Sequence, residues 1–259
     1  MKLRDTFNGV IEDYNYARPH YPDGLYHDIE KFVGRPLQQC RILEVGGGTG
    51  QASDYFVQLG CRLTILEVGE DQVVWLREKY KDFPNVDVVG GYFEEFAAEE
   101  RFDLIYSATA FHWIPAEVGY KKAYELLKPG GTMAVFWHMS SVTLHVGPVH
   151  DGLNGLKRQY MPEVSLGFDE EGLRAAHEKR LAQIQTGGWF PAPEYHEYRW
   201  DDRYDAVRYA ALLNSYSDTQ EYLSEEKRAE YLKAVAGHIE RCGGEVEMPQ
   251  YVRLYLVKK

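Results

Sequence analysis

Two patterns of hydrophobic and polar residues alternate along this chain. Short apolar runs rich in β-branched residues predict buried strands, and longer stretches with one apolar face predict helices. The expected strands are 42–45, 60–67, 86–96 with its loop, 103–106, 132–138, 194–200 and 249–257. The expected helices are 23–33, 51–59, 70–80, 120–127, 147–161, 169–185, 205–214 and one that begins after Ser224. This alternation predicts an α/β fold with a mostly parallel sheet.

The most informative stretch is 41–51, where an apolar strand runs into glycines. Gly46, Gly48 and Gly50 permit a tight turn, and their lack of side chains lets a ligand lie against the backbone. A predicted helix follows, and its first N–H groups would face that ligand. Strand, glycine turn and helix together predict a nucleotide-type pocket at the carboxyl end of a parallel strand. The alternative is a turn that only joins the strand to the helix.

The spacing of the glycines bears on which ligand this pocket would hold. The dinucleotide fingerprint G-x-G-x-x-G, counted from Gly46, needs a glycine where this chain has Gln51. The pattern present is Glu-x-Gly-x-Gly-x-Gly, and the carboxylate of Glu44 suits an ammonium or sulfonium ligand and repels a pyrophosphate. An NAD(P)-dependent oxidoreductase stays open as an alternative, although the chain lacks the third fingerprint glycine and a recognisable Tyr/Lys pair for hydride chemistry.

This glycine pattern resembles motif I of the class I S-adenosylmethionine-dependent methyltransferases. Leu-Leu-Lys-Pro-Gly-Gly at 126–131 and Ser-Ala-Thr-Ala-Phe-His-Trp at 107–113 are similar to the same family, and within it to relatives of trans-aconitate methyltransferase. The resemblance covers 7–139 well and the remainder more loosely. It implies S-adenosyl-L-methionine as cofactor, a small-molecule acceptor, and a Rossmann-like, seven-stranded, mostly parallel sheet with an antiparallel last strand and a helical cap insertion.

The resemblance also suggests a division of the chain. Residues 1–139 would form a cofactor-binding core with an N-terminal lid, 140–187 a helical cap over the acceptor site, and 188–259 the strands and helices that complete the sheet. Three potential metal ligands lie in or near the cap, but their spacing matches no metal site. They are His145, His150 and Asp151.

Several residues are expected to bind the cofactor. The lid residues Tyr14 and Arg18 would approach its methionine end, because an arginine is a natural partner for a carboxylate. Glu67 ends the second strand, where an acid can accept from both ribose hydroxyls. Structural alternatives stay open: a surface arginine, a carboxylate that caps the next helix, or aromatic side chains that belong to the core. The full predicted set is Tyr14, Arg18, Glu44, Gly46, Gly48, Gly50, Gln51, Glu67, Val68, Tyr92, Phe93, Ser107 and Phe111.

The chemistry expected at this site needs few catalytic groups. Methyl transfer from a sulfonium is an in-line displacement, so alignment and desolvation suffice unless the acceptor must lose a proton. His112, in the loop after the fourth strand, is the candidate base, and a structural histidine is the alternative. Aromatic residues could surround the sulfonium and the acceptor, or belong to the core: Tyr14, Phe111, Trp113 and Trp137. A non-catalytic protein that kept the cofactor fold also stays open.

The composition of the chain limits which substrates and cellular locations are expected. The chain has 29 basic and 40 acidic residues, so its formal charge is 29 − 40 = −11, which argues against a nucleic-acid substrate. No stretch approaches the apolar length of a membrane span, and residues 1–8 lack the apolar core of a signal peptide. The three cysteines suggest no disulfide framework, so a reducing cytoplasm is expected. The sequence does not indicate an oligomeric state.

Overall fold

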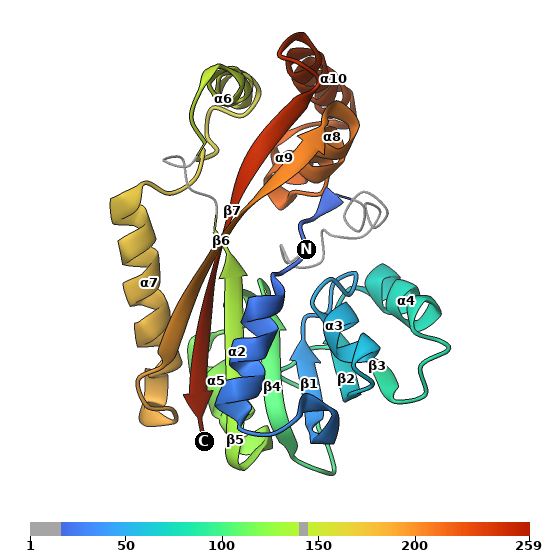
Figure 1. The fold of residues 1–259 in the computed structure, drawn as a ribbon, viewed down its shortest axis with the longest axis vertical. Coiled ribbons are helices and arrows are strands. Elements are labelled where there is room, and N and C mark those ends of the chain that lie inside the picture. The colour runs from blue at the N-terminus through green and yellow to red at the C-terminus, as the bar shows by residue number, and fades with distance from the viewer. Residues whose placement is uncertain (1–16, 140–144) are drawn as a thin grey trace. The chain divides into compact units, whose positions relative to one another are not determined.

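The computed structural model describes residues 17–139 and 145–259, drawn as a coloured ribbon in Figure 1. Its strands are β1 (Arg41–Val45), β2 (Arg62–Glu67), β3 (Val86–Gly90), β4 (Phe102–Ala108), β5 (Leu127–His138), β6 (Glu194–Asp205) and β7 (Glu245–Lys258). Its α-helices are α2 (Asp23–Val33), α3 (Ser53–Gln58), α4 (Glu70–Lys79), α5 (Ala116–Leu126), α6 (Pro148–Tyr160), α7 (Glu170–Ile184), α8 (Ala206–Asn214), α9 (Ser217–Tyr222) and α10 (Glu225–Arg241). Short 3₁₀ turns are η2 (Leu37–Gln39), η3 (Phe111–Trp113) and η4 (Thr186–Gly188).

The seven strands form one sheet in the order β3-β2-β1-β4-β5-β7-β6. Strands β1 to β5 pair in parallel with their neighbours, and β7 pairs antiparallel with β5. The predicted seven-stranded, mostly parallel α/β sheet with an antiparallel end is confirmed. The apolar runs became the central strands because both faces of a parallel sheet are buried under helices; in β4, for example, every residue from Phe102 to Ser107 is buried.

The strand order places the glycine turn at the point where ligands bind in this kind of sheet. The chain leaves β1 toward β2 on one side, and β4 lies on the other side of β1 (Figure 1). The loops after β1 and β4 therefore leave the same edge in opposite directions, and ligands of such sheets bind at this point, outside the carboxyl ends of the strands. The turn after β1 and the loop after β4 both lie at this point.

Contacts divide the chain into two compact units. One comprises Met1–Pro19, Met139–Ala175 and Arg199–Tyr251, and its described core contains side chains from α6, β6, α8, α10 and β7, with Tyr204 and Tyr231 among the largest. The other comprises His20–His138, Ala176–Tyr198 and Val252–Lys259 and contains the parallel strands. The sequence-based division into core, cap and C-terminal part follows chain order and stays a prediction.

Most helices and strands lie where the hydrophobic pattern predicted them, and the differences have physical causes. Strand β5 begins at Leu127 and not at 132, because Leu127 already pairs with Phe102 of β4 before a register shift. The short helix α9 was not predicted, since six polar residues show no apolar period. Within the described residues, no helix combines the length and apolarity needed to cross a membrane.

Candidate active site

The glycine turn after β1 is built from backbone that other residues do not readily adopt. Gly46, Gly48 and Gly50 have φ angles of 81°, 57° and 91°. The N–H of Gly46 donates to the carbonyl of Leu66 in β2 at 2.8 Å, which ties the start of the turn to the neighbouring strand. A Cβ on Gly46 would lie 2.4 Å from the Cβ of Ala110, in the loop after β4. The turn and that loop are therefore in direct contact, and a side chain at position 46 has no room.

Glu67, at the end of β2, connects this turn to the start of α4. Its Oε2 accepts from the N–H of Gly48 at 2.7 Å, and its Oε1 accepts from the N–H groups of Val68 and Gly69 at 2.8 Å each. The side chain is 8% exposed. Glu67 thus bonds the backbone around the start of α4 and also holds the glycine turn. Each carboxylate oxygen has two lone pairs, so Oε2, which accepts one N–H, can still accept from a sugar hydroxyl; the ribose contact stays a prediction.

Side chains from the second half of α4 and from Tyr80, the residue after it, donate hydrogen bonds to carbonyls of the same glycine turn. The indole N–H of Trp75 donates to the carbonyl of Thr49 at 3.3 Å, and the Lys79 ammonium donates to the same carbonyl at 3.0 Å. The hydroxyl of Tyr80 donates to the carbonyl of Gly50 at 3.1 Å. These three side chains were not predicted from the sequence, because no local pattern at 75–80 indicates a contact with Thr49 and Gly50, which lie 25 or more positions earlier.

Glu44 lies beneath the turn. It is 1% exposed, and the hydroxyl of Ser53 in α3 donates to its Oε2. Its Oε1 has no hydrogen-bond partner in the part of the chain that the structure describes. Desolvation raises the pKa of Glu44 to about 8, which favours the neutral acid at neutral pH. The predicted pairing of its charge with a sulfonium stays a prediction, and a nearby cation would oppose this shift.

The loop after β4 contains a strained residue that the sequence did not reveal. Thr109 has a φ of 52°, the one positive value for a non-glycine residue in the described chain. Its hydroxyl lies 3.0 Å from the Tyr21 hydroxyl and accepts from the N–H of His138 at 3.1 Å. A β-branched residue in this conformation is an outlier, and such strain often occurs at functional sites. Threonine itself gives no sequence signal for such a conformation.

Three of the predicted cofactor-binding residues, which lie in β4 or in the loops after β3 and β4, are buried. Ser107 is fully buried and donates to the carbonyl of Val45, which joins β4 to β1. The rings of Phe93 and Phe111 are 3% and 2% exposed and lie 5.8 Å apart, and Phe111 also packs against Tyr120. These contacts join β4 to β1 and pack Phe111 against Phe93 and Tyr120. Direct contact with a cofactor stays a prediction for all three residues.

His112, in η3, belongs to a polar cluster at the ends of β4 and β5. The indole N–H of Trp137 donates to its Nδ1 at 3.1 Å, and the guanidinium carbon of Arg180 lies 4.3 Å from the centre of the Trp137 ring. Desolvation, followed by the charges of Arg180 and Lys179, lowers the pKa of His112 to about 4. His112 also keeps an exposed side, and the lowered pKa favours the neutral imidazole. Arg180 was not anticipated from the sequence.

The remaining predicted residues are less close to one another. Gln51 lies in the turn and accepts from the Thr49 hydroxyl at 2.9 Å. Arg18 belongs to the other compact unit, where its guanidinium donates to the hydroxyl and the carbonyl of Ser215 at 3.1 and 3.3 Å. Tyr14 lies outside the described residues. The lid contacts predicted for Arg18 and Tyr14 stay predictions.

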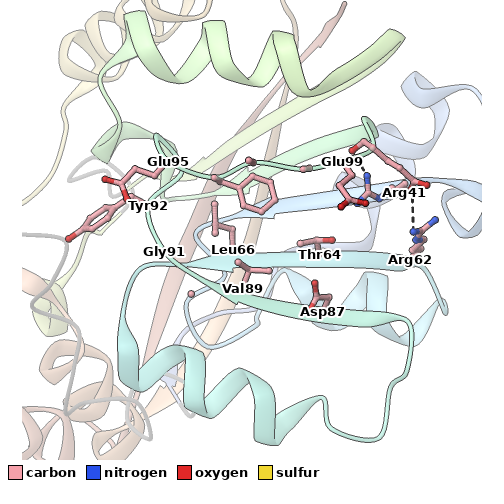
Figure 2. Close-up of a pocket in the computed structure, with 15 residues that line it drawn as sticks. Arg41, Arg62, Thr64, Leu66, Asp87, Val89, Gly91, Tyr92, Glu95 and Glu99 are labelled. Atoms are coloured by element: carbon pink, nitrogen blue, oxygen red, sulfur yellow. Dashed lines mark hydrogen bonds and ion pairs between the residues drawn. The ribbon is translucent and has the colours of Figure 1, made fainter.

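A cavity of about 580 Å³ lies along one face of β2 and β3. Figure 2 shows Tyr92 and Glu95 at one end and Arg41 and Arg62 at the other. The connection from β3 to β4, residues 91–101, forms turns and no helix, so no helix from this connection covers that face. Tyr92 is thus the one predicted adenine-loop residue that lines a cavity and keeps partial exposure. The residues that line the cavity are Arg41, Arg62, Thr64, Leu66, Asp87, Val89, Gly90, Gly91, Tyr92, Glu95, Phe96, Ala97, Ala98, Glu99 and Glu100.

Comparison with known proteins decides between the ligands that this geometry permits. The family model described as a methyltransferase domain matches residues 42–131, from β1 to the first part of β5. Residues 42–131 are a methyltransferase domain. This match agrees with the class I, S-adenosylmethionine-dependent type expected from motif I. Membership of the trans-aconitate branch stays a prediction.

Curated relatives agree with this assignment. An uncharacterised methyltransferase-like protein of Schizosaccharomyces pombe is 33% identical over 142 residues, 54% of each chain. Malonyl-acyl-carrier-protein O-methyltransferase 1 of Ilyobacter polytropus is 31% identical over 128 residues, 48% of this chain and 46% of the relative. The chain thus spans about half the length of the curated relatives it matches.

Two solved structures resemble nearly the whole chain. A protein of Anaeromyxobacter dehalogenans described as a type II methyltransferase superimposes with a TM-score of 0.61 at 18% identity, over 93% of this chain and 97% of that one. An N-methyltransferase of Haemonchus contortus, solved with phosphomonomethylethanolamine and S-adenosylhomocysteine, gives 0.53 at 13% identity, over 100% of this chain and 60% of that one. At these identities the two structures support the fold alone.

Proposed function

We propose that this protein transfers a methyl group from S-adenosylmethionine to a small-molecule acceptor by in-line displacement. The observation that supports this most directly is the glycine turn of the methyltransferase domain. Three glycines at positive φ bring bare backbone to the carboxyl edge of β1, and the acid that ends β2 bonds the same turn. An NAD(P) pocket would need a glycine where Gln51 stands.

The residues present suit this cofactor. The absence of a side chain at Gly46 and Gly48 leaves backbone that a ligand can approach closely. Glu67 offers carboxylate oxygens to hydroxyl donors such as those of a ribose. Tyr92, which belongs to the predicted adenine loop, offers an aromatic face. The predicted cofactor contacts of Arg18, Gln51 and Val68 belong to the same proposal.

The chain's part in the reaction is mainly to align and desolvate the reactants. When bound, S-adenosylmethionine supplies a methyl group already activated by its sulfonium leaving group. The bonds from Glu67 and from Trp75, Lys79 and Tyr80 would fix the turn, so that little ordering remains to be done on binding. The loop from Thr109 to Trp113, which contacts Gly46 through Ala110, would place the acceptor against the methyl group.

The acceptor is proposed to be a small molecule and not a nucleic acid, since the net charge of −11 gives no general attraction to phosphates. Relatives of this domain include proteins named malonyl-acyl-carrier-protein O-methyltransferases. Oxygen acceptors, free and linked to a carrier, therefore belong in the substrate screen. A reducing cytoplasm stays the expected location.

Calorimetric titration separates the candidate functions. We expect S-adenosylmethionine and S-adenosylhomocysteine to bind with micromolar dissociation constants and NAD(H) and NADP(H) to show no binding, followed by transfer of a radiolabelled methyl group to a member of an acceptor panel. Binding of a dinucleotide in place of S-adenosylmethionine would overturn the proposal. Cofactor binding without transfer to any acceptor would favour the non-catalytic alternative.

A further inference from the structure

Three side chains from separate elements meet at the ends of β4 and β5. Trp137, the residue before the last of β5, is 4% exposed. One edge of its indole donates to His112, and its ring face lies against the guanidinium of Arg180 from α7. We call these three residues the His112 cluster. All of them belong to the unit that contains the parallel strands.

The bond from Trp137 determines which nitrogen of His112 holds its proton. An indole N–H can only donate, so Nδ1 of His112 must be the acceptor. A neutral imidazole with an accepting Nδ1 has its proton on Nε2. His112 therefore presents an N–H donor on the side of the ring away from Trp137. It cannot take up a second proton at Nδ1 unless the bond to Trp137 breaks.

Among the residues that the structure describes, Arg180 is a cation without an acidic partner. Its Nη1 donates to the neutral amide of Gln183 at 2.6 Å, and within the described residues no carboxylate lies at ion-pair distance from it. Its other close neighbours are aromatic, with Trp137 below the guanidinium and the hydroxyls of Tyr120 and Tyr255 near enough to act on its charge. A partly buried guanidinium with unused donors is a strong site for a carboxylate or another oxyanion.

We propose that Arg180 and the Nε2–H of His112 together bind an anionic oxygen group of the methyl acceptor. The identification of this ligand as the acceptor rests on the proposed methyltransferase function; the anion site itself does not. His112 is then a hydrogen-bond donor that orients the acceptor, and not a base. This assignment is consistent chemically, because an acceptor oxygen that is already an anion has no proton to lose before it attacks the methyl group.

The position of the cluster fits this role. His112 follows Ala110 by two residues, and Ala110 contacts the glycine turn at Gly46. The donors are therefore on the same loop that closes one side of the proposed cofactor site. No other part of the proposed mechanism uses Arg180.

The tautomer of His112 can be measured directly. Two-bond ¹⁵N–¹H correlation spectra of the ¹⁵N-labelled protein near neutral pH should show His112 protonated at Nε2, with Nδ1 unprotonated. In Trp137→Phe this preference should weaken, because Nδ1 loses its donor. A proton on Nδ1, or a charged ring at neutral pH in the unmodified protein, would overturn the assignment of His112 as a donor.

The anion site is tested with malonate and malonamide, which have similar shapes and differ in charge. Both with and without S-adenosylhomocysteine, malonate should cause a saturable shift of the His112 Nε2 signal, and malonamide should cause none. Arg180→Gln should weaken malonate binding at least about tenfold, as expected for loss of a charge-assisted bond. Lys179→Gln, which removes the adjacent exposed charge on the same helix, should change it less than about twofold.

Each outcome bears on one proposal at a time. Equal responses to malonate and malonamide, no response to either, or equal losses in the two charge variants would overturn the anion site. Titration with S-adenosylhomocysteine alone reports on the cofactor site and does not involve Arg180. A failure of the methyltransferase proposal would therefore appear as lost cofactor binding, with the tautomer and the anion response unchanged.

Discussion

Replacement of Glu67 by alanine tests the part of the cofactor site on which the other contacts depend. The change removes the acceptor for three backbone N–H groups, those of Gly48, Val68 and Gly69, which lie 2.7 to 2.8 Å from the carboxylate. Hydrogen bonds to a charged group contribute about 1.5–3 kcal/mol each, but water can enter and replace part of this. We expect Glu67→Ala to lower the free energy of unfolding by about 3 kcal/mol, measured by urea denaturation.

The proposed ribose contact requires a separate measurement, because a loosened turn would also weaken binding. We would titrate S-adenosylhomocysteine and its 2′,3′-dideoxy analogue into the unmodified protein and into Glu67→Ala. The unmodified protein should bind the dideoxy analogue at least about tenfold more weakly, since the carboxylate loses its hydroxyl donors. Glu67→Ala should bind the two ligands almost equally. The comparison works as a double-mutant cycle in which the general loosening cancels.

The matched control is Glu70→Ala, which removes an exposed acid from the first turn of the same helix. It should leave both affinities unchanged and cost only a few tenths of a kcal/mol. If Glu67→Ala distinguished the two ligands as strongly as the unmodified protein, the ribose would have another partner. Glu67 would then be a purely structural residue.

Two further predictions concern the turn and the acid beneath it. Gly46→Ala and Gly34→Ala should each lose about 1 kcal/mol of stability from a φ of 81°. Gly46→Ala should lose more than Gly34→Ala in total, and only Gly46→Ala should also lose binding of S-adenosylhomocysteine by calorimetry, because only there does the new Cβ meet another side chain. Unchanged binding in Gly46→Ala would show that the turn can move aside. Burial raises the pKa of Glu44 from 4.5 to about 8, so the folded state binds the proton more tightly and stability falls as pH rises from 4.5 to 8. The Glu44→Gln variant has no titrating group at this position, so its stability should not fall in this way. Urea denaturation near pH 5 and near pH 8 should show that the stability of Glu44→Gln, relative to the unmodified protein, is higher at pH 8 by on the order of a few kcal/mol. Parallel pH profiles of the two proteins would refute the raised pKa.

The sequence alone determined the order of the main elements and the kind of pocket. A strand such as β1 follows from consecutive apolar residues, and the turn after it follows from glycines that tolerate positive φ. Both are properties of backbone and side chains within a few residues, so they can be inferred before anything is known of the tertiary structure. The position of Glu67 at the end of β2 was predicted on the same local grounds.

The tertiary structure alone decided which side chains work together. Tyr80 reaches the carbonyl of Gly50, Trp137 selects the proton position on His112, and Arg180 approaches from α7. Each of these contacts joins residues 25 or more positions apart and depends on how helices and loops pack on the sheet. Local sequence patterns do not encode such distances, because the hydrogen-bonding direction of a side chain is set by its packed neighbours. For this reason His112 could be proposed as a base from the sequence, and only its contact with Trp137 indicates that it donates.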